Sequence, residues 1–349
     1  MKFGLFTLFD FHPDRQEESY YYTETLNLLE LADELGFERL WLGEEHFYSF
    51  GICPRPSVYL SAVAQRTKKM RLGTAVTLLP FDNPLRVAED YAMLDVISGG
   101  RVDLGVGRGL IPKHFEGFPI PPDETRARMN EGIDVVLKAW TQETFSHDGE
   151  FFNYPELSVS PRPIQQPHPP LWVGTLSPES FERAGNLGQN IMVVPFLSGP
   201  FEHVKQQVDR YRSLLVLNKH DINAIEDMFV FFLFVNEDHD AALAEAREVA
   251  ARYMALLAQN IPPPSADMPP EIRQQSEALR NQLESFVDNI EERAVVGTPE
   301  RCRERVAELQ DYFGVKNMSF YLHAGARDFG DARRSLELFA SDVLPHFRK

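Results

Sequence analysis

The sequence predicts an α/β fold of the (β/α)₈ TIM-barrel type, in which eight parallel strands alternate with helices. Eight short apolar runs of strand type occur along the 349 residues, and segments with helical periodicity separate them. The β–α alternation repeats four times up to residue 142, which is typical of a parallel sheet. A doubly wound sheet is the alternative, but it normally has a glycine-rich turn after its first strand. The segment FDFHPD follows the first strand here and contains no glycine.

The first half of the chain contains the four regular β–α units. RLGTAVTLLP and VDLGVG are joined by a helix-length amphipathic run, so these two strands are expected to be parallel. The expected strands are 3–8, 37–42, 71–79 and 102–107, and the expected helices are 20–35, 57–67, the run between strands three and four, and 125–142.

The second half supplies four further strands. The run MFVFFLFV is apolar throughout, as expected of a strand buried on both faces. Thr298-Pro299-Glu300 is a helix start, with threonine at the N-cap and proline at the first helical position. The expected strands are 171–175, 191–194, 228–235 and 318–322, and the expected helices are 177–187, 201–217, 238–257, 298–313 and 331–347.

Two segments interrupt the alternation, between strands four and five (143–170) and between strands seven and eight (257–292). In the first, FSHDGEFFNY predicts a hairpin with a turn at Asp148-Gly149. In the second, proline-rich residues precede a polar helix at 271–290, which is either a lid over the barrel mouth or a solvated surface helix. We therefore expect one barrel domain, 1–349, with two insertions.

Composition excludes several classes of function. Fifty-two acidic residues against 35 basic ones give a net charge of −17, which disfavours binding to nucleic acid or to anionic membranes. No apolar run approaches the roughly 20 residues of a membrane span, and the N-terminus does not resemble a signal peptide. Two cysteines, Cys53 and Cys302, form no thiolate metal cluster and suit a reducing cytosol. We expect a cytoplasmic protein without a metal site.

The residues that follow the strands are the candidates for a site, because barrel active sites lie at the carboxyl ends of the strands. Arg108 stands among the glycines that end the fourth strand, and Ser177 caps the helix after the fifth. A helix N-terminus together with an arginine predicts an anion-binding site. The alternatives are an arginine paired with an acid and a helix cap without a ligand.

Glu44, Glu45 and His46 follow the second strand and form a second candidate cluster. A carboxylate beside a histidine suits general acid–base catalysis. The alternative is a loop ion pair, for example with Arg55. Lone histidines at strand ends, such as His323, are more often hydrogen-bonded filler.

Several segments together resemble the bacterial luciferase-like flavin monooxygenases. They are MKFGLFTL, GFERLWLGEEHFYSFG, LGTAVTLLPFDNPLRVAEDYAMLDVISGGRVDLGVGRGL and PLWVGTLSPESFERAGNLG. The tail, VVGTPERCRERV and SLELFASDVLPHFRK, resembles the single-chain, non-luminescent members. The resemblance implies a two-component enzyme that receives reduced FMN from a separate flavin reductase. In such an enzyme oxygen would add at the flavin C4a, and the resulting peroxyflavin would oxidise a small organic substrate. It also implies a homodimer.

The resemblance assigns roles to individual residues. Arg108 and Ser177 would hold the FMN phosphate, and Gly107 and Ser180 would lie in the same cofactor site. Ala75 and Val76 would line the flavin ring through a peptide bond that is often cis in this family.

Two departures argue against light emission. Glu45 replaces the first of two successive histidines of the luciferase α chain, so that only His46 is left, and Gly107 replaces its reactive cysteine. Two alternatives stay open: an F420-dependent hydride-transfer enzyme of the same superfamily, and a non-catalytic flavin-binding protein. The loop Arg108-Gly109-Leu110 resembles the FMN members more. Aromatic residues near the mouth suggest an apolar pocket: Phe9, Phe11, Phe47, Tyr48, Phe50, Phe115, Phe118 and Phe196.

Overall fold

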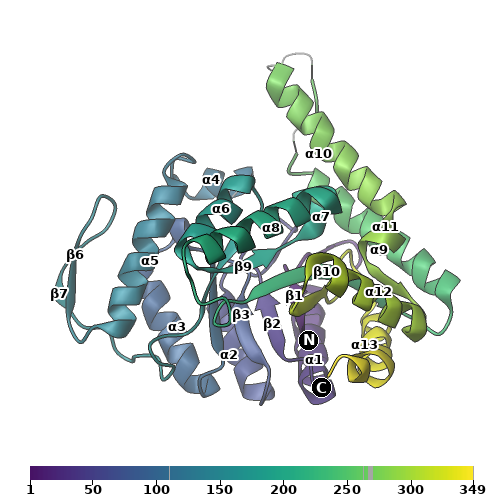
Figure 1. The fold of residues 1–349 in the computed structure, drawn as a ribbon, viewed down its shortest axis with the longest axis horizontal. Helices are drawn as coiled ribbons and strands as arrows, with labels where there is room; N and C mark the ends of the chain where they lie inside the picture. The colour runs from purple at the N-terminus through teal and green to yellow at the C-terminus, as the bar shows by residue number, and fades with distance from the viewer. Residues whose placement is uncertain (110, 262, 266–269, 349) are drawn as a thin grey trace.

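The computed structural model describes residues 1–109, 111–261, 263–265 and 270–348. Eight parallel strands pair in a closed ring, and helices surround it (Figure 1), so the predicted (β/α)₈ barrel is confirmed. In ring order the strands are β1 (Lys2–Thr7), β2 (Arg39–Leu42), β3 (Arg71–Thr74), β5 (Val102–Gly107), β8 (Leu171–Thr175), β9 (Asn190–Val193), β10 (Asp227–Val235) and β12 (Asn317–Tyr321).

Large side chains fill the inside of the barrel and helices cover its outside, so the strands are buried on both faces. Every residue of β10 is buried, as its apolar sequence predicts. Trp41 and Trp172 meet edge to face, with ring centroids 4.9 Å apart, and the guanidinium group of Arg39 lies 5.1 Å from the Trp172 ring. This packing closes the barrel interior below the strand ends and leaves the mouth as the place for a ligand.

The third strand differs from the prediction of one strand at 71–79. It stops at Thr74 and resumes as β4 (Thr77–Leu78), because a cis peptide bond joins Ala75 to Val76 and takes these residues out of the ladder. The Thr74 hydroxyl bridges the interruption: it donates to the Gly105 carbonyl oxygen (2.7 Å) and accepts from the Gly105 N–H (3.0 Å). The side chain thus ties β3 to β5 beside the interruption.

Helices cover the outside of the barrel, and helical structure is present in each segment where a helix was predicted. Glycines with positive φ, Gly36, Gly99, Gly188 and Gly314, end four of them. Thr298 caps its helix as expected. The helices are α1 (Glu18–Leu35), α2 (Pro56–Arg66), α3 (Pro84–Ser98), α5 (Thr125–Thr141), α6 (Pro178–Leu187), α7 (Pro195–Ser198), α8 (Phe201–Leu217), α9 (His239–Ala258), α12 (Pro299–Phe313) and α13 (Phe329–Leu338).

Further elements differ from the sequence-based expectation. The single helix expected at 331–347 is wrong, because α13 is followed by a π-helical turn (Phe339–Val343) and a 3₁₀ turn (Leu344–His346). Short elements were missed at η1 (Leu79–Phe81), α4 (Pro112–Gly117), α11 (Ile290–Arg293) and β11 (Val295–Gly297). Of these, α4 is important for the site.

The two insertions form separate features of the molecule (Figure 1). β6 (Phe145–Asp148) and β7 (Asn153–Leu157) pair as the predicted antiparallel hairpin, with a longer turn over residues 149–152. α10 (Pro270–Asp288) projects from the body of the molecule and is anchored at its C-terminal end by the buried Leu283 and Phe286. Residues 262 and 266–269 of the predicted second insertion, and Leu110 of the Arg108 loop, lie outside the described residues.

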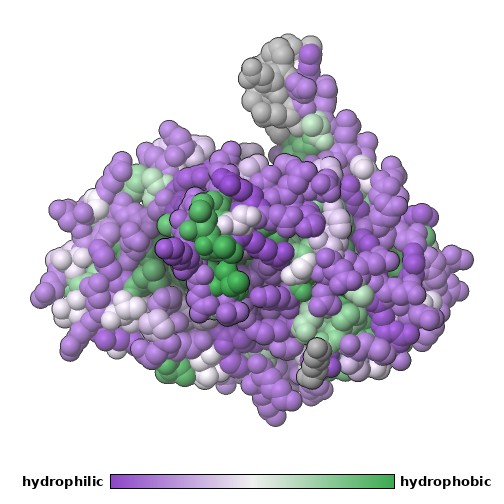
Figure 2. All heavy atoms as spheres, in the orientation of Figure 1, coloured by the Kyte–Doolittle hydropathy of each residue, from purple (hydrophilic) through white to green (hydrophobic). Residues whose placement is uncertain are grey.

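The surface is mainly hydrophilic, with hydrophobic side chains gathered near the middle of the face in Figure 2. Among the helices that the structure describes, none has the length and apolar character needed to cross a bilayer. Within the described part of the chain, no group of three or more histidine, cysteine or carboxylate side chains is placed to bind a metal ion.

Candidate active site

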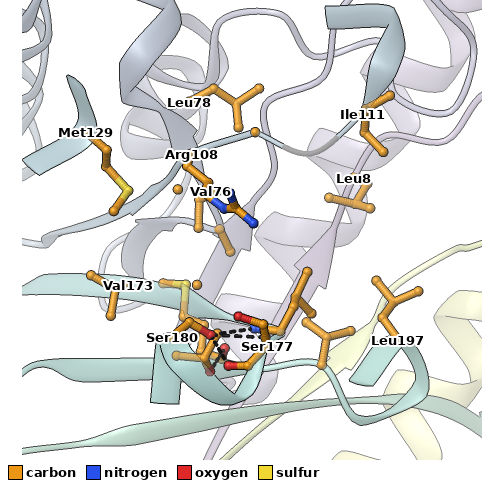
Figure 3. A pocket seen from close by; sticks show the side chains of 18 of the residues that line it. Leu8, Val76, Leu78, Arg108, Ile111, Met129, Val173, Ser177, Ser180 and Leu197 are labelled. Atoms are coloured by element: carbon orange, nitrogen blue, oxygen red, sulfur yellow. Dashed lines mark hydrogen bonds between the residues drawn. The ribbon is translucent and has the colours of Figure 1, made fainter. Parts of the chain in front are cut away.

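The main pocket, about 270 Å³ in volume, opens among residues at the carboxyl ends of the barrel strands. Its lining is largely apolar, with polar groups concentrated in a few places (Figure 3). Seven of the nine predicted site residues line it: Glu45, Ala75, Val76, Gly107, Arg108, Ser177 and Ser180.

Arginines gather at one end of this pocket. Arg108 follows β5 and points into the pocket (Figure 3), and Arg126 on α5 and Arg183 on α6 also line it. Burial, followed by repulsion from Arg126, lowers the pKa of Arg108, and the same two causes lower the pKa of Arg183. Nowhere in the described chain does a carboxylate form an ion pair with any of the three. Such a concentration of positive charge suits a phosphate group.

The amino end of α6 completes this end of the pocket. Ser177 is its N-cap and Pro178 its first residue, as predicted, so the positive end of the helix dipole faces the arginines. The Ser180 hydroxyl accepts from the N–H groups of Ser177 (3.1 Å) and Leu176 (3.2 Å) and donates to the Ser177 carbonyl oxygen (2.6 Å). Since a hydroxyl has one proton and two lone pairs, Ser180 is fully used in the helix cap.

The cis peptide and the glycines of β5 shape the adjoining wall. Ala75 and Val76 line the pocket at the break between β3 and β4. A Cβ atom on Gly107 would lie 2.3 Å from Cγ2 of Val76, and one on Gly105 would lie 1.9 Å from the Thr74 carbonyl oxygen. The glycine-rich sequence therefore lets β5 pack directly against the cis peptide.

The remaining wall is apolar. Leu8, Ile111 and Leu197 lie across the pocket from Met129 and Val173 (Figure 3). Of the eight aromatic residues expected near the mouth, Phe50 and Phe196 line this pocket, whereas Phe9 and Phe11 are part of the main core. The pocket thus combines a cationic end with an apolar chamber.

The predicted Glu44–Glu45–His46 cluster is divided by the structure. Glu44 and His46 do not line the pocket; they pair with each other, with His46 Nε2 3.0 Å from Glu44 Oε1. Glu44 Oε2 also accepts from the Leu78 N–H (3.2 Å), and burial is the main reason why the pKa of Glu44 is raised. The alternative pairing with Arg55 is wrong, because that arginine binds Asp82.

The Glu45 side chain points the other way and lines the pocket. Gly51 folds against it, since a Cβ on that glycine would lie 2.5 Å from the Glu45 Cβ. The Tyr48 hydroxyl donates to Glu45 Oε2 (3.1 Å), and His114 Nε2 lies 3.0 Å from the same oxygen. His114 belongs to α4, lines the pocket and is 1% exposed.

Comparison with known proteins places this site in a family. Residues 1–315 match the family described as luciferase-like monooxygenase. The chain belongs to this family. The resemblance predicted from the sequence is therefore confirmed, and the pocket lies at the barrel mouth of a luciferase-like monooxygenase.

Two similar proteins match over nearly the whole chain. The oxygenase component of the flavin-dependent trigonelline monooxygenase from Acinetobacter baylyi is 29% identical over 99% of this chain and 96% of its own length. The monooxygenase RslO1 from Streptomyces bottropensis is 31% identical, with a TM-score of 0.83 and full coverage of both chains.

More distant solved structures share the fold. They are the oxygenating constituent of 3,6-diketocamphane monooxygenase from Pseudomonas putida in complex with FMN and an F420-dependent secondary alcohol dehydrogenase. The first is 20% identical with a TM-score of 0.81, covering 99% of this chain and 98% of its own. The second is 18% identical with a TM-score of 0.74, covering 100% and 99%.

This luciferase-like site contains three residues that sequence reasoning missed: Arg126, Arg183 and His114. The arginines lie on helices, where a charged residue normally faces solvent. His114 lies in a six-residue helix between proline and glycine, a stretch expected to be a loop. Conversely, His323 is buried away from the pocket, bonded to Tyr21 and Thr25, as expected of filler.

Proposed function

We propose that this chain is the oxygenase component of a two-component flavin-dependent monooxygenase. It would take reduced FMN from a separate reductase and use oxygen to oxidise a small, mainly apolar organic molecule. The observation that carries this proposal is the cationic end formed by Arg108, Arg126, Arg183 and the start of α6, joined to an apolar chamber in one pocket. The name of the trigonelline relative, an oxygenase component, supports the same division of labour.

The residues present fit FMN. Its phosphate dianion would neutralise arginines that have no ion pair within the described chain, and a bidentate contact with Arg108 is the strongest available. Ala75, Val76 and Gly107 would offer the flat, apolar wall that a flavin ring needs. When bound, reduced FMN supplies the electrons that activate oxygen; the chain binds it, orients it and excludes water.

The apolar chamber favours an apolar substrate. Leu8, Phe50, Phe196, Leu197 and Leu257 all contribute side chains to it, and none carries a polar group. A substrate would gain affinity from burial of its own apolar surface there. The homodimer, the cytoplasmic location and the single-domain organisation stay predictions.

An anaerobic titration separates the three candidate functions. The purified protein is titrated with reduced FMN and, separately, with reduced F420, and oxygen is then admitted. Saturable binding of reduced FMN, followed by a flavin absorbance transient that free reduced FMN does not give, supports the monooxygenase. Tight F420 binding without an oxygen reaction would favour hydride transfer. FMN retention without any altered oxygen reaction would favour a flavin-binding protein.

A further inference from the structure

We propose that His114 is a catalytic acid–base group of this pocket and that Glu45 shares its proton. The inference rests on the proposed monooxygenase function, because the group that exchanges the proton would be a reacting molecule in the same pocket. His114 would exchange this proton through Nδ1, and Glu45 would compensate at Nε2.

The Nδ1 atom of His114 is in an unusual position for a buried polar atom. It is inaccessible to solvent, and no partner for it exists among the described residues. The residue nevertheless lines the pocket. Most buried polar atoms have a hydrogen-bond partner. A molecule bound in the pocket would supply the hydrogen-bond partner that Nδ1 lacks.

Neighbouring residues hold the imidazole in place. The ring packs edge to face on Phe81, with centroids 6.0 Å apart. Phe47 closes over Gly117, where a Cβ would lie 2.1 Å from the Phe47 ring. These contacts fix α4 against the loop after β2, so His114 and Glu45 are presented as a rigid pair.

The contacts at Nε2 define where the protons are. The backbone N–H of His46 points at this atom from 3.3 Å, which favours the tautomer with its proton on Nδ1. Glu45 Oε2 is 3.0 Å from the same Nε2. The lone pairs of this oxygen and this nitrogen would repel each other if neither atom carried a proton. In the proposed arrangement one proton bridges Oε2 and Nε2, and a second is carried by Nδ1.

Tyr48 does not supply a proton to this pair. Burial, followed by the charge of Glu45, raises the pKa of Tyr48, so its hydroxyl stays protonated and serves as a donor to Glu45. Its role is to hold the carboxyl group in position. The proton that can move is the one shared by Glu45 and His114.

The proton transfer balances without any other reagent. A base in the pocket takes the proton from Nδ1, and the shared proton settles on Nε2. Glu45 is left as a carboxylate and His114 as a neutral imidazole with its lone pair on Nδ1. The pair has lost one proton in total, and a proton taken up at Nδ1 reverses both movements. The pair thus serves as an acid in one direction and as a base in the other.

Other charged groups near His114 are already paired or lie elsewhere in the pocket. Lys113 and Glu116 on α4 form an ion pair with each other, and His46 is bound to Glu44. Next to η1, Asp82 is bound to Arg55. The pocket arginines, including Arg108 and Arg126, form its cationic end. Glu45 is therefore the carboxylate in direct contact with His114.

Nuclear magnetic resonance of the cofactor-free protein tests the proton positions. The full chain is labelled with ¹⁵N-histidine, the His114 signals are assigned with His114→Asn, and the protonated nitrogen is identified between pH 5 and 9. We expect Nδ1 to carry a proton in the wild type and the Nε2 signal to shift in Glu45→Gln, because the bridging proton is lost. A wild-type His114 with an unprotonated Nδ1, or an Nε2 signal that Glu45→Gln leaves unchanged, would overturn the inference.

The oxygen reaction supplies an independent readout. Reduced FMN is bound anaerobically to each variant and mixed with oxygen in single turnovers from pH 6 to 9. We expect the rate in His114→Asn and in Glu45→Gln to fall at least ~10-fold and to lose the wild-type pH dependence. His147→Gln is the matched control: it also removes a histidine beside a carboxylate, Glu131, but outside the pocket, and should keep the wild-type profile.

The two proposals fail in different ways. If the wild-type protein does not bind reduced FMN, the proposed function is wrong, whereas the tautomer measurement still decides the state of His114. If FMN binds and reacts but the His114 variant keeps the wild-type pH profile, only the inference about His114 is wrong.

Discussion

The Oε2 atom of Glu45 lies 3.0 Å from Nε2 of His114, although the two residues are 69 positions apart in the chain. One follows β2 and the other lies in α4 after β5, and both line the main pocket. The neighbouring Glu44 and His46 pair with each other instead. Three consecutive polar residues are thus divided by the fold into one that faces the pocket and two that do not.

Replacing Arg108 by alanine should weaken the binding of reduced FMN about 10- to 100-fold. The change removes charge-assisted hydrogen bonds to the phosphate, which contribute about 1.5–3 kcal/mol. Anaerobic fluorescence titration measures the dissociation constant. Arg86→Ala, on the exposed face of α3, is the matched control and should bind FMN as the wild type does. Equal affinities for both variants would show that the phosphate lies elsewhere.

Gly105→Ala should destabilise the fold by about 3 kcal/mol. The new Cβ would lie 1.9 Å from the Thr74 carbonyl oxygen, so the backbone beside the cis peptide would have to move. Urea unfolding gives the change in free energy. Gly174→Ala is the control, because its Cβ would meet only Val76 Cγ1, at 3.3 Å, and should cost under about 1 kcal/mol. Similar unfolding midpoints would contradict the packing described for β5.

Thr74→Val should cost about 1–3 kcal/mol, although the two side chains have similar shapes. The substitution leaves the N–H and carbonyl groups of Gly105 buried and without the hydroxyl that bonds both. Chemical denaturation measures the loss. Thr23→Val, at an exposed position of α1, should change stability by less than about 0.5 kcal/mol. If the two variants were equally stable, the bridge across the broken strand would be unimportant.

Stability should fall between pH 6.5 and 4 because of His323. Burial lowers the pKa of His323 from 6.5 to about 4, while Tyr21 and Thr25 bond its two ring nitrogens. Over this window the unfolded chain binds the proton and the folded chain does not, so stability is complete above pH 6.5 and is lost as the pH falls. The loss between pH 7.5 and 4.5 should be roughly 2–3 kcal/mol.

Urea unfolding of His323→Gln at the same two pH values isolates this contribution. Glutamine does not titrate, so the variant should be less stable at pH 7.5 but should lose roughly 2–3 kcal/mol less on acidification than the wild type. An identical pH dependence in both proteins would mean that other groups are responsible.

The barrel was predictable because its strands are long enough to be read as apolar runs. The errors occurred where short elements or special backbone decide the structure. β11 has three residues, and the strand expected at 71–79 is broken by a cis peptide that no propensity indicates. The cis bond between Ala75 and Val76 was expected only from the family resemblance.

The site was less predictable than the fold because it depends on contacts between distant segments. Arg108 and Ser177 were found through local signals, a glycine-rich strand end and a helix cap. Arg126 and Arg183 have no such signal, since in the sequence each is only one charged residue on an amphipathic helix. His114 is placed in the site by its contact with Glu45 and by a short helix. The sequence does not reveal this helix, because it begins with a proline and ends with a glycine.

The central claim is that the cationic end of the pocket holds the phosphate of reduced FMN. A crystal structure of the full chain with FMN, prepared and frozen under anaerobic reducing conditions, tests this most directly. We predict phosphate oxygens within hydrogen-bond distance of Arg108 and of the start of α6 at Ser177, with the flavin ring against Ala75 and Val76. A flavin whose phosphate lies away from Arg108, or a pocket that stays empty at saturating FMN, would contradict the claim.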